Sequence, residues 1–290
     1  MSESTAIHTY NMPLTLEQHF KMLAESYPSV QELHGLWTIL RGRIEDELIS
    51  SRHNFVNYSL HDASHSRSVI QSIERFLGEG RIRQLSATDT FMLLICAYAH
   101  DYGMAQSFRK IYNILGSREF ESFLRKMDEN KNMLEKEDAW AIHNLLCYLD
   151  RAKPSLALND MYFSIMLVIQ MYLRPNHWKG AADIVEDFDK LLQGGLKRRF
   201  IWGSEGVVEI CKSHGQPIQT ILSFSQRAGG IVGDEFHPRF VAAMLRLGIC
   251  WIWIMEGSPT GLSRRFPKMR LLFLSFLPCI TGSMKRFPTY

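Results

Sequence analysis

The sequence predicts an all-α protein, and three observations lead to this expectation. Apolar residues recur three and four positions apart between residues 30 and 50, which is the spacing of one helical face. Residues that start and end helices bracket this and similar stretches. No stretch sustains the alternation of apolar and polar residues that is typical of a strand, so we expect no sheet.

Capping signals define the first predicted helices. Thr15 followed by Gln18 has the pattern of a capping box, which predicts a helix to about residue 25. Residue 62 or 64 can cap a helix that ends at the glycines 78 and 80. Thr88 or Asp89 is expected to start the next helix, which is apolar nearly all round over 91–99 and should therefore be buried.

The second half of the chain shows the same helical patterns. Pro175 should end a helix at 173, because proline lacks the amide hydrogen and disfavours helical geometry in the residue before it. Glycines at 229, 230 and 233 predict a loop. The further predicted helices span 117–127, 136–151, 160–173, 178–193, 204–213 and 236–247.

Composition limits the class of protein. Hydrophobic residues make up 46% and charged residues 22% of the 290 residues, which is typical of a globular protein. The five cysteines are far apart and form no CxxC pair, which favours a reducing compartment over a disulfide framework or a zinc knuckle. No secretory signal is visible, and the apolar stretch 271–277 is too short to cross a bilayer. We therefore expect a cytoplasmic protein without a membrane partner.

The net charge of +3 comes from the C-terminal segment. Residues 249–290 hold six of the 33 Lys and Arg residues and one of the 30 Asp and Glu residues. The rest of the chain therefore has 27 basic and 29 acidic residues, a net charge of −2. Because nucleic-acid-binding proteins need concentrated positive charge, we expect no nucleic-acid partner.

Most of the eleven histidines need no special role. His8, His19, His34 and His53 lie among polar residues, so we expect each to face solvent. His143 lies on an amphipathic helix, which favours a position on the surface or at a capped edge of the core.

The pair His100-Asp101 is different, because it follows the apolar run that should enter the core. A buried carboxylate is costly unless a positive charge meets it. A divalent metal meets this need, since Asp can bridge two ions while the adjacent His binds one. The alternative is a helix end that returns to the surface with Gly103 as its C-cap.

Four more histidines lie near helix ends. His61 and His65 are four apart and share a face if both are helical, a spacing that can bind metal; alternatively, only one of them faces inward. His177 and His214 each end an apolar helical stretch, where a cap or a surface position is also common.

The order of these motifs resembles the HD superfamily of metal-dependent phosphohydrolases. Residues 65–69 (HSRSV) resemble the first-histidine motif, and residues 97–104 (AYAHDYGM) resemble the signature doublet. Residues 174–177 (RPNH) and 210–215 (ICKSHG) resemble the third and fourth histidine sites of the two-metal branch. Residues 58–65 (YSLHDASH) most resemble HD domains that precede a GHKL-type ATPase in longer bacterial proteins.

The resemblance implies an HD-domain helical bundle over residues 30–248, after an N-terminal extension over 1–29. It implies a site for two divalent ions (Mn, Fe, Co, Ni or Zn), with Asp101 bridging them, and a water of lowered pKa that attacks phosphorus. The implied metal ligands are His65, His100, Asp101, His177 and His214, of which His100 and Asp101 would also be catalytic.

The resemblance also implies binding partners. The expected substrate is a small phosphorylated molecule such as a nucleotide. Arg174 or Lys179 would neutralise its phosphate, and His61 would orient a ligand or touch the substrate. A GHKL-type ATPase domain would accompany the HD domain in the full-length parent, in a role in bacterial signalling.

One expected ligand is missing. The family places an aspartate shortly after an Ala-x-x-Leu-Arg-Leu helix, which residues 242–247 match, but residues 249–257 (ICWIWIMEG) contain no aspartate. Read one base earlier, each Trp-Ile step encodes Asp, because Trp has only the codon TGG and Ile begins with AT. We therefore hypothesise a one-base frameshift near Gly248, which would make 249–290 an aberrant tail. The alternative is a divergent tail that binds a membrane or a partner through its Trp and Arg residues.

Three functions remain open at this point. The first is a phosphohydrolase, active in the in-frame parent and impaired in this 290-residue form by the loss of the last Asp ligand. The second is a non-catalytic regulatory module that senses a nucleotide or a metal. The third is a structural helical domain whose histidines are incidental.

Overall fold

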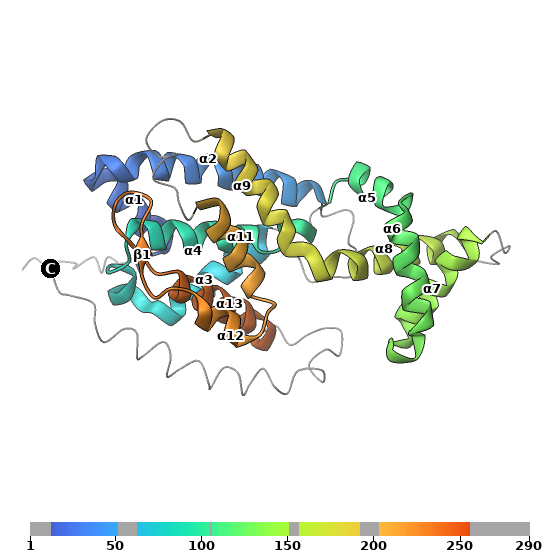
Figure 1. Cartoon of the computed structure of the whole chain (residues 1–290). Helices are drawn as coiled ribbons and strands as arrows, with labels where there is room; N and C mark the ends of the chain where they lie inside the picture. Colours follow the sequence, from blue (N-terminus) through green and yellow to red (C-terminus); the bar gives the residue numbers. More distant parts are fainter. Residues whose placement is uncertain (1–12, 52–62, 105, 151–156, 192–202, 256–290) are drawn as a thin grey trace, which may run out of the picture.

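The computed structural model describes residues 13–51, 63–104, 106–150, 157–191 and 203–255. These residues form helices almost throughout, which confirms the predicted all-α class (Figure 1). Two parts are distinguished below. The body comprises the described residues of 13–104 and 174–255, and the helical lobe comprises those of 108–173.

The bounds of the elements follow chain order. The body begins with helices α1 (Leu16–Ser26), α2 (Pro28–Ser51), α3 (Ala63–Ile82), α4 (Ala87–Ala99) and the 3₁₀ helix η2 (Tyr102–Met104). The helical lobe contains α5 (Phe108–Leu115), α6 (Arg118–Glu129), η3 (Lys131–Met133), α7 (Lys136–Leu149) and α8 (Leu158–Leu173). The body resumes with η4 (Arg174–Lys179), α9 (Gly180–Leu191), α11 (Gly203–Ser213), α12 (Ile218–Ser223), β1 (Ala228–Gly229), β2 (Glu235–Phe236) and α13 (Pro238–Met255).

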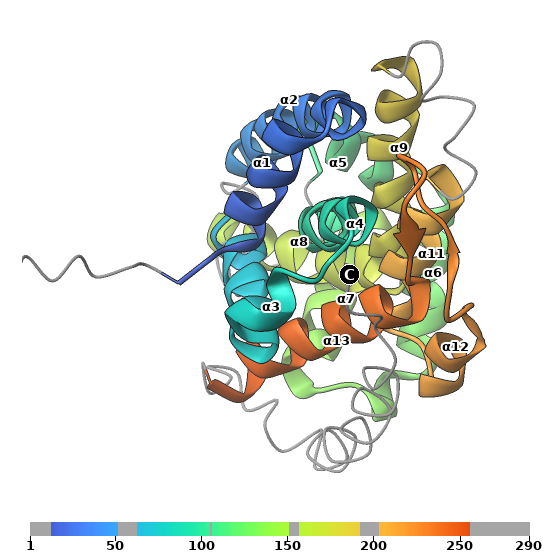
Figure 2. The same ribbon diagram turned by 90° about the vertical axis from the view of Figure 1, so that its left-hand side faces the viewer.

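Helix α4 lies at the centre of the body, and all thirteen of its residues are buried. Figure 2 shows it end-on, with the other helices of the body arranged around it. Its residues are apolar on nearly every side, so the helix is stable only where neighbours cover its whole surface. The prediction of a buried helix over 91–99 is therefore confirmed, and the end of α4 delivers His100 and Asp101 to the interior.

The helical lobe has a hydrophobic core of its own. It extends to one side of the body, on the right of Figure 1. Helices α7 and α8 pack against each other, and α6 packs against α7. The buried residues of this second core are Ile111, Phe120, Leu124, Ala141, Ile142, Leu145, Leu146, Val168 and Ile169.

Helix α13 packs along α3 and continues past the predicted end at 247. A Cβ atom on Gly248 would lie 2.9 Å from Ile73 Cγ1, so glycine permits the close approach of the two helices. The Trp251 and Phe76 rings then meet edge to face, with centroids 5.2 Å apart, and Ile252 is buried. The apolar residues after Gly248 thus extend the face that contacts α3. The proposed tail boundary at 249 falls inside this helix, while 256–290 lie outside the described residues.

The N-terminal capping signals were partly right. The capping box of Thr15 and Gln18 is present at α1. The cap of α4 is Ser86, whose hydroxyl accepts a hydrogen bond from the Asp89 amide, and not Thr88 or Asp89 as predicted. Both of those side chains are buried and have other partners. The Thr88 hydroxyl donates a hydrogen bond to Asp234, between β1 and β2, and the Asp89 carboxylate pairs with His237, which follows β2.

Several boundaries differ from the predictions because the patterns are short. Within the described residues, β1 and β2 form an antiparallel ladder of two residues each, too short to show alternation. The short helices α5 and α12 were not predicted. Helix α3 is interrupted by a kink at Gly78, as the predicted helix end there indicates, because its φ of 65° is not helical but is readily adopted by glycine; a further helical stretch then continues to Ile82. Pro175 does end α8, and the chain continues as the 3₁₀ helix η4.

The prediction that His19 faces solvent is wrong. It is 5% exposed on the inner face of α1, where its Nε2 pairs with the Leu85 carbonyl at 3.0 Å and burial lowers its pKa. His34 is half-buried, with its ring 5.3 Å from that of Phe20, and His143 lies on the surface of the lobe. His8 and His53 lie outside the described residues. None of the described helices combines the length and the apolar character needed to cross a membrane, and no disulfide links the described cysteines.

Candidate metal centre

The C-terminal end of α4 holds His100 and Asp101 inside the body. His100 is fully buried, and its Nε2 lies 3.2 Å from Asp101 Oδ2. The chain then turns into η2, where Tyr102, Gly103 and Met104 are all buried. The alternative of a helix end that surfaces with Gly103 as its C-cap is therefore wrong, because His100 is the cap and the chain stays inside.

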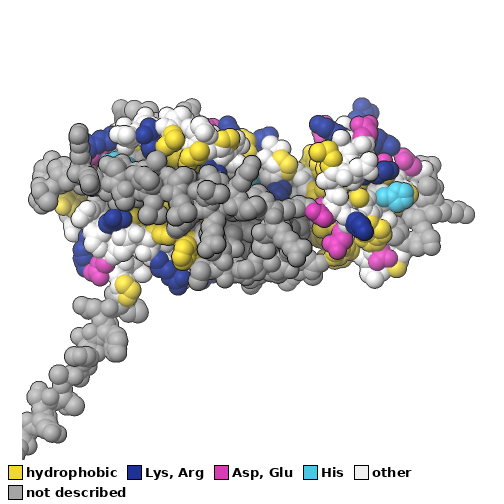
Figure 3. Space-filling view, turned by 90° about the horizontal axis from the view of Figure 1, so that it is seen from below, with side chains coloured by type: hydrophobic (Ala, Val, Ile, Leu, Met, Phe, Trp, Pro, Cys, Tyr) yellow, Lys and Arg dark blue, Asp and Glu magenta, His cyan; other side chains and the backbone are white. Residues whose placement is uncertain are grey.

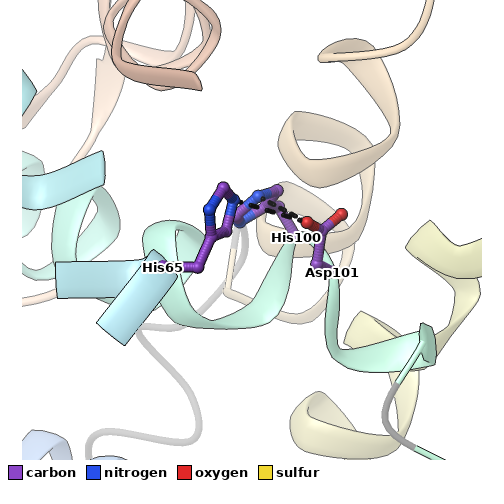
Figure 4. A group of neighbouring side chains, drawn as sticks. All are labelled: His65, His100 and Asp101. Atoms are coloured by element: carbon purple, nitrogen blue, oxygen red, sulfur yellow. Dashed lines mark ion pairs between the residues drawn. The ribbon is translucent and has the colours of Figure 1, made fainter. Parts of the chain in front are cut away.

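His65 reaches the same carboxylate from the first turn of α3. Its Nε2 lies 3.6 Å from Asp101 Oδ2, and its ring centroid lies 5.4 Å from that of His100. Figure 4 shows both imidazoles directed toward the same side of the Asp101 carboxylate. His61 lies outside the described residues, so the predicted pairing of His61 with His65 stays a prediction.

Two histidines from the second half of the chain complete the cluster. His177, in η4, places Nε2 3.3 Å from Asp101 Oδ1. His214 directly follows α11 and places its Nε2 3.0 Å from the Nε2 of His177. Its ring also meets that of His100 edge to face, with centroids 5.3 Å apart. The structure thus brings together all five residues that the resemblance implied as ligands.

The two oxygens of Asp101 divide the cluster into two groups. Oδ2 faces His65 and His100, and Oδ1 faces His177, which is next to His214. In each group of three, the potential ligand atoms lie within 4.8 Å of one another. A carboxylate that belongs to both groups is the arrangement expected of a bridging ligand.

The helix ends also orient the imidazole rings. The Nδ1 atoms of His100, His177 and His214 each pair with the backbone carbonyl three residues earlier, that of Ala97, Arg174 and Cys211 respectively. A ring that donates from Nδ1 carries its lone pair on Nε2. In all three cases that Nε2 faces the cluster, in the tautomer that binds metal.

The donor atoms fit a divalent cation. His100 Nε2 is buried without a hydrogen-bond partner, and burial lowers the pKa of His214 to about 4, so this ring is neutral at physiological pH. The Nε2 atoms of His177 and His214 lie 3.0 Å apart, close enough for both to bind one cation. Four imidazoles with one carboxylate suit Mn, Fe, Co, Ni or Zn better than Ca.

Comparison with family models gives one match, to HD-CE, over residues 55–248. The chain belongs to the HD-CE family. The matched range contains all five cluster residues and the whole helical lobe. Neither the curated proteins nor the solved structures include a match to this chain.

The HD-CE domain of this chain exposes both predicted phosphate-binding residues near the cluster. Arg174 directs its backbone carbonyl to His177 Nδ1, and its side chain is exposed. Lys179, two residues after His177, is also exposed, with its amine 5.8 Å from the centroid of the Trp178 ring.

No carboxylate follows Gly248 where the resemblance expects one. Residues 249–252 are Ile, Cys, Trp and Ile, and Ile249 packs against the core of the body. The cluster of described residues therefore has four imidazoles but only one carboxylate.

Sequence reasoning missed a second buried histidine and aspartate. Asp89 Oδ2 lies 2.6 Å from His237 Nδ1, and Asp89 Oδ1 accepts a hydrogen bond from the His237 amide. Burial raises the pKa of Asp89, and the hydrogen bond to Asp89 raises that of His237. This pair joins the first turn of α4 to the residue before α13. No local motif connects two residues that are 148 positions apart.

Proposed function

We propose that this HD-CE domain is a divalent-metal-dependent phosphohydrolase that acts on a nucleotide-like phosphoester in the cytoplasm. The observation that supports the proposal is the convergence of four imidazoles around one partly buried carboxylate. Divalent ions held there would lower the pKa of water and neutralise charge that develops on a phosphate.

The residues of the chain have distinct parts in this proposal. Asp101 would hold the metal together with His65, His100, His177 and His214, and the carbonyls of Ala97, Arg174 and Cys211 would keep three of these imidazoles oriented toward it. A single carboxylate cannot cancel the charge of two divalent ions, so the loaded site attracts an anion. The exposed side chains of Arg174 and Lys179 would contact the substrate phosphate, Arg174 by a bidentate contact.

The apolar residues at 249–252 weaken this activity in the 290-residue chain. Without the expected carboxylate one ion lacks an oxygen ligand, so we expect reduced metal occupancy and little hydrolysis. The frameshift hypothesis accounts for this sequence, and reading the gene around codon 248 tests it. A well-supported uninterrupted frame through Ile249 would refute it.

The same residues favour a second candidate function. An HD-CE domain that binds metal or nucleotide without turnover would act as a sensing module, coupled in a longer parent protein to a GHKL-type ATPase domain. Its support is the absence of a carboxylate at 249–252, which leaves binding groups in place but lowers catalytic capacity.

Elemental analysis and an assay panel test the two candidates. We expect bound Mn, Fe, Co, Ni or Zn in the purified chain and about 10- to 100-fold weaker binding in His100→Ala. The panel comprises nucleotides, cyclic nucleotides and bis(p-nitrophenyl) phosphate, with Mn²⁺ added. Metal content unchanged by His100→Ala would refute the proposed centre.

Replacing Ile249 sharpens the test of catalysis. Ile249→Asp should raise both metal content and hydrolysis, whereas the neutral control Ile249→Asn should raise neither to the same extent. If metal binds but Ile249→Asp leaves every substrate of the panel intact, the phosphohydrolase proposal is wrong and the sensing module is favoured.

A further inference from the structure

A pocket of about 570 Å³ lies between the body and the helical lobe. Its walls come from η2, α5, the end of α8, η4 and the start of α9. These elements meet where the lobe joins the body, near the middle of Figure 1. A pocket of this size falls within the range that holds a small organic ligand.

The pocket adjoins the metal centre through a shared backbone wall. A Cβ atom on Gly103 would lie 1.9 Å from the His177 carbonyl oxygen, and one on Gly180 would lie 2.2 Å from Gly103 N. The backbones of η2 and η4 are therefore in direct contact. Two of the lining residues, Gly103 and Lys179, are each two positions from a cluster residue, a Cα separation of at most about 7 Å.

The polar side chains of the pocket favour an anion with hydrogen-bonding groups. Lys110 and Asp183 pair at 3.3 Å and cancel each other's charge, whereas Lys179 makes no ion pair within the described part of the chain. The pocket therefore carries one uncompensated positive charge. Asn113 and Asn176 are exposed to it, and neither side chain makes a hydrogen bond to another described residue.

The apolar part of the wall is rigid. Tyr172, Ile114 and Leu173 line the pocket on the side of the lobe. The Tyr172 ring meets the rings of Phe120 and Phe123 edge to face, each with centroids 5.3 Å apart. A pocket lined by an aromatic ring, aliphatic side chains and amides suits a flat heterocycle, because amides both donate and accept hydrogen bonds.

We propose that this pocket binds the nucleoside part of a nucleotide. The base packs against Tyr172 and its aliphatic neighbours, Asn113 and Asn176 hydrogen-bond to the base or sugar, and Lys179 pairs with the phosphate. This assignment rests on the phosphohydrolase function proposed above, since it places the substrate's phosphate toward the metal centre. To that function it adds a binding site for the nucleoside and the residues that determine specificity for it.

Titration calorimetry of the full chain with chelator present tests the pocket apart from catalysis. The probes are AMP, GMP, CMP and UMP, with ribose 5-phosphate and inorganic phosphate as references. We expect at least one nucleotide to bind more tightly than both references. Lys179→Ala should weaken that binding about tenfold, because a charge-assisted contact is lost, and Asn176→Ala should weaken it to a smaller extent. Lys126→Ala, which removes an exposed lysine of α6 outside the pocket, should have no effect.

Three outcomes would overturn the assignment: no binding of any nucleotide, binding no tighter than that of ribose 5-phosphate, or binding unchanged in both Lys179→Ala and Asn176→Ala. Hydrolysis of bis(p-nitrophenyl) phosphate with Mn²⁺, measured on the same preparations, separates this failure from failure of the proposed function. Turnover without pocket-dependent nucleotide binding refutes the pocket alone. Pocket-dependent binding without turnover of any substrate, also in Ile249→Asp, refutes catalysis and supports the pocket.

Discussion

The body and the helical lobe use the same secondary structure for different purposes. The body surrounds α4 on every side and gathers the ends of α3, α4, η4 and α11 around one carboxylate. The lobe has a smaller core and contributes no residue to that cluster, although its α5 and α8 line the adjoining pocket. The metal cluster therefore depends on the positions of the helix ends in the body, whereas the lobe forms part of the wall of the adjoining pocket.

The surfaces of the two parts also differ. Of the thirteen large hydrophobic side chains that are exposed among the described residues, nine belong to the lobe. Figure 3 shows apolar side chains among charged ones at the right-hand end of the molecule, where the lobe lies. Because the lobe contributes no residue to the cluster, substitutions in the lobe should leave metal binding unchanged, whereas substitutions in the body near the cluster should weaken it.

Removal of the shared carboxylate should have the largest effect. Asp101→Asn keeps the size of the side chain but removes the only negative charge among the five cluster residues, so we expect metal binding to fall by more than about 100-fold. The matched change in the lobe, His143→Ala, removes an exposed histidine and should leave metal content unchanged. Elemental analysis after dialysis measures the metal content of both variants. An equal loss of metal in the two would contradict the conclusion that only the body forms the metal centre.

Cavities in the two cores should cost similar stability but differ in function. Leu94 in α4 and Leu124 in α6 are both fully buried, so replacing either by Ala should destabilise its part of the chain by about 2–5 kcal/mol. Leu94→Ala should also weaken metal binding, because α4 positions His100. Urea unfolding and metal titration of each variant check this, and weaker metal binding in Leu124→Ala would show that the parts are coupled.

A single methyl group added at the shared wall should have a smaller effect. In Gly103→Ala the new Cβ would overlap the His177 carbonyl, so η2 and η4 must separate. We expect a loss of about 1–3 kcal/mol and weaker metal binding. In Gly116→Ala, in the lobe, the nearest atom is the Tyr112 carbonyl oxygen at 3.8 Å, so stability should hardly change. Thermal unfolding with and without Mn²⁺ distinguishes the two variants.

The smallest effect expected is a pH dependence of stability from the Asp89–His237 pair. The hydrogen bond to Asp89 raises the pKa of His237 above its ordinary value of 6.5, with Glu235 also raising it and Arg227 lowering it. Because the folded chain holds this proton more tightly than the unfolded chain, the stability gained is present below pH 6.5 and is lost as pH rises through the higher, folded pKa.

Urea midpoints at pH 6.0 and pH 8.5 measure this dependence. His237→Gln removes the titrating group but keeps the backbone amide that Asp89 accepts from, so its midpoint should fall less than that of the wild type between the two pH values. An equal fall in both proteins would assign the pH dependence to other groups.

The sequence was informative where its signals are local. The capping box at Thr15, the apolar run over 91–99 and the stop at Pro175 each involve neighbours in the chain, and each is present in the structure. The five cluster residues were selected by the resemblance to the HD superfamily, and each of them lies at or near an end of a helical pattern. Their convergence could not be derived from spacing, since it depends on how α3, η4 and α11 pack around α4.

The features that were missed depend on distant partners. His19 lies among polar residues in the sequence but faces Leu85, 66 positions away. Asp89 has the residue type and position of a helix cap, yet tertiary contacts pair it with His237. Helix α13 continues past Gly248 because α3 offers an apolar face there, which the sequence of α13 alone does not show.

The hydrogen bonds from Nδ1 to carbonyls of the same helix end have a consequence for metal exchange. Each of the three rings is fixed by its own local backbone, so its alignment precedes the arrival of an ion and survives the ion's departure. A small zinc-dependent domain, by contrast, unfolds when its ion is removed. This chain should instead keep its helical circular dichroism in excess chelator, and after dialysis against metal it should regain the metal content that it had before, without refolding.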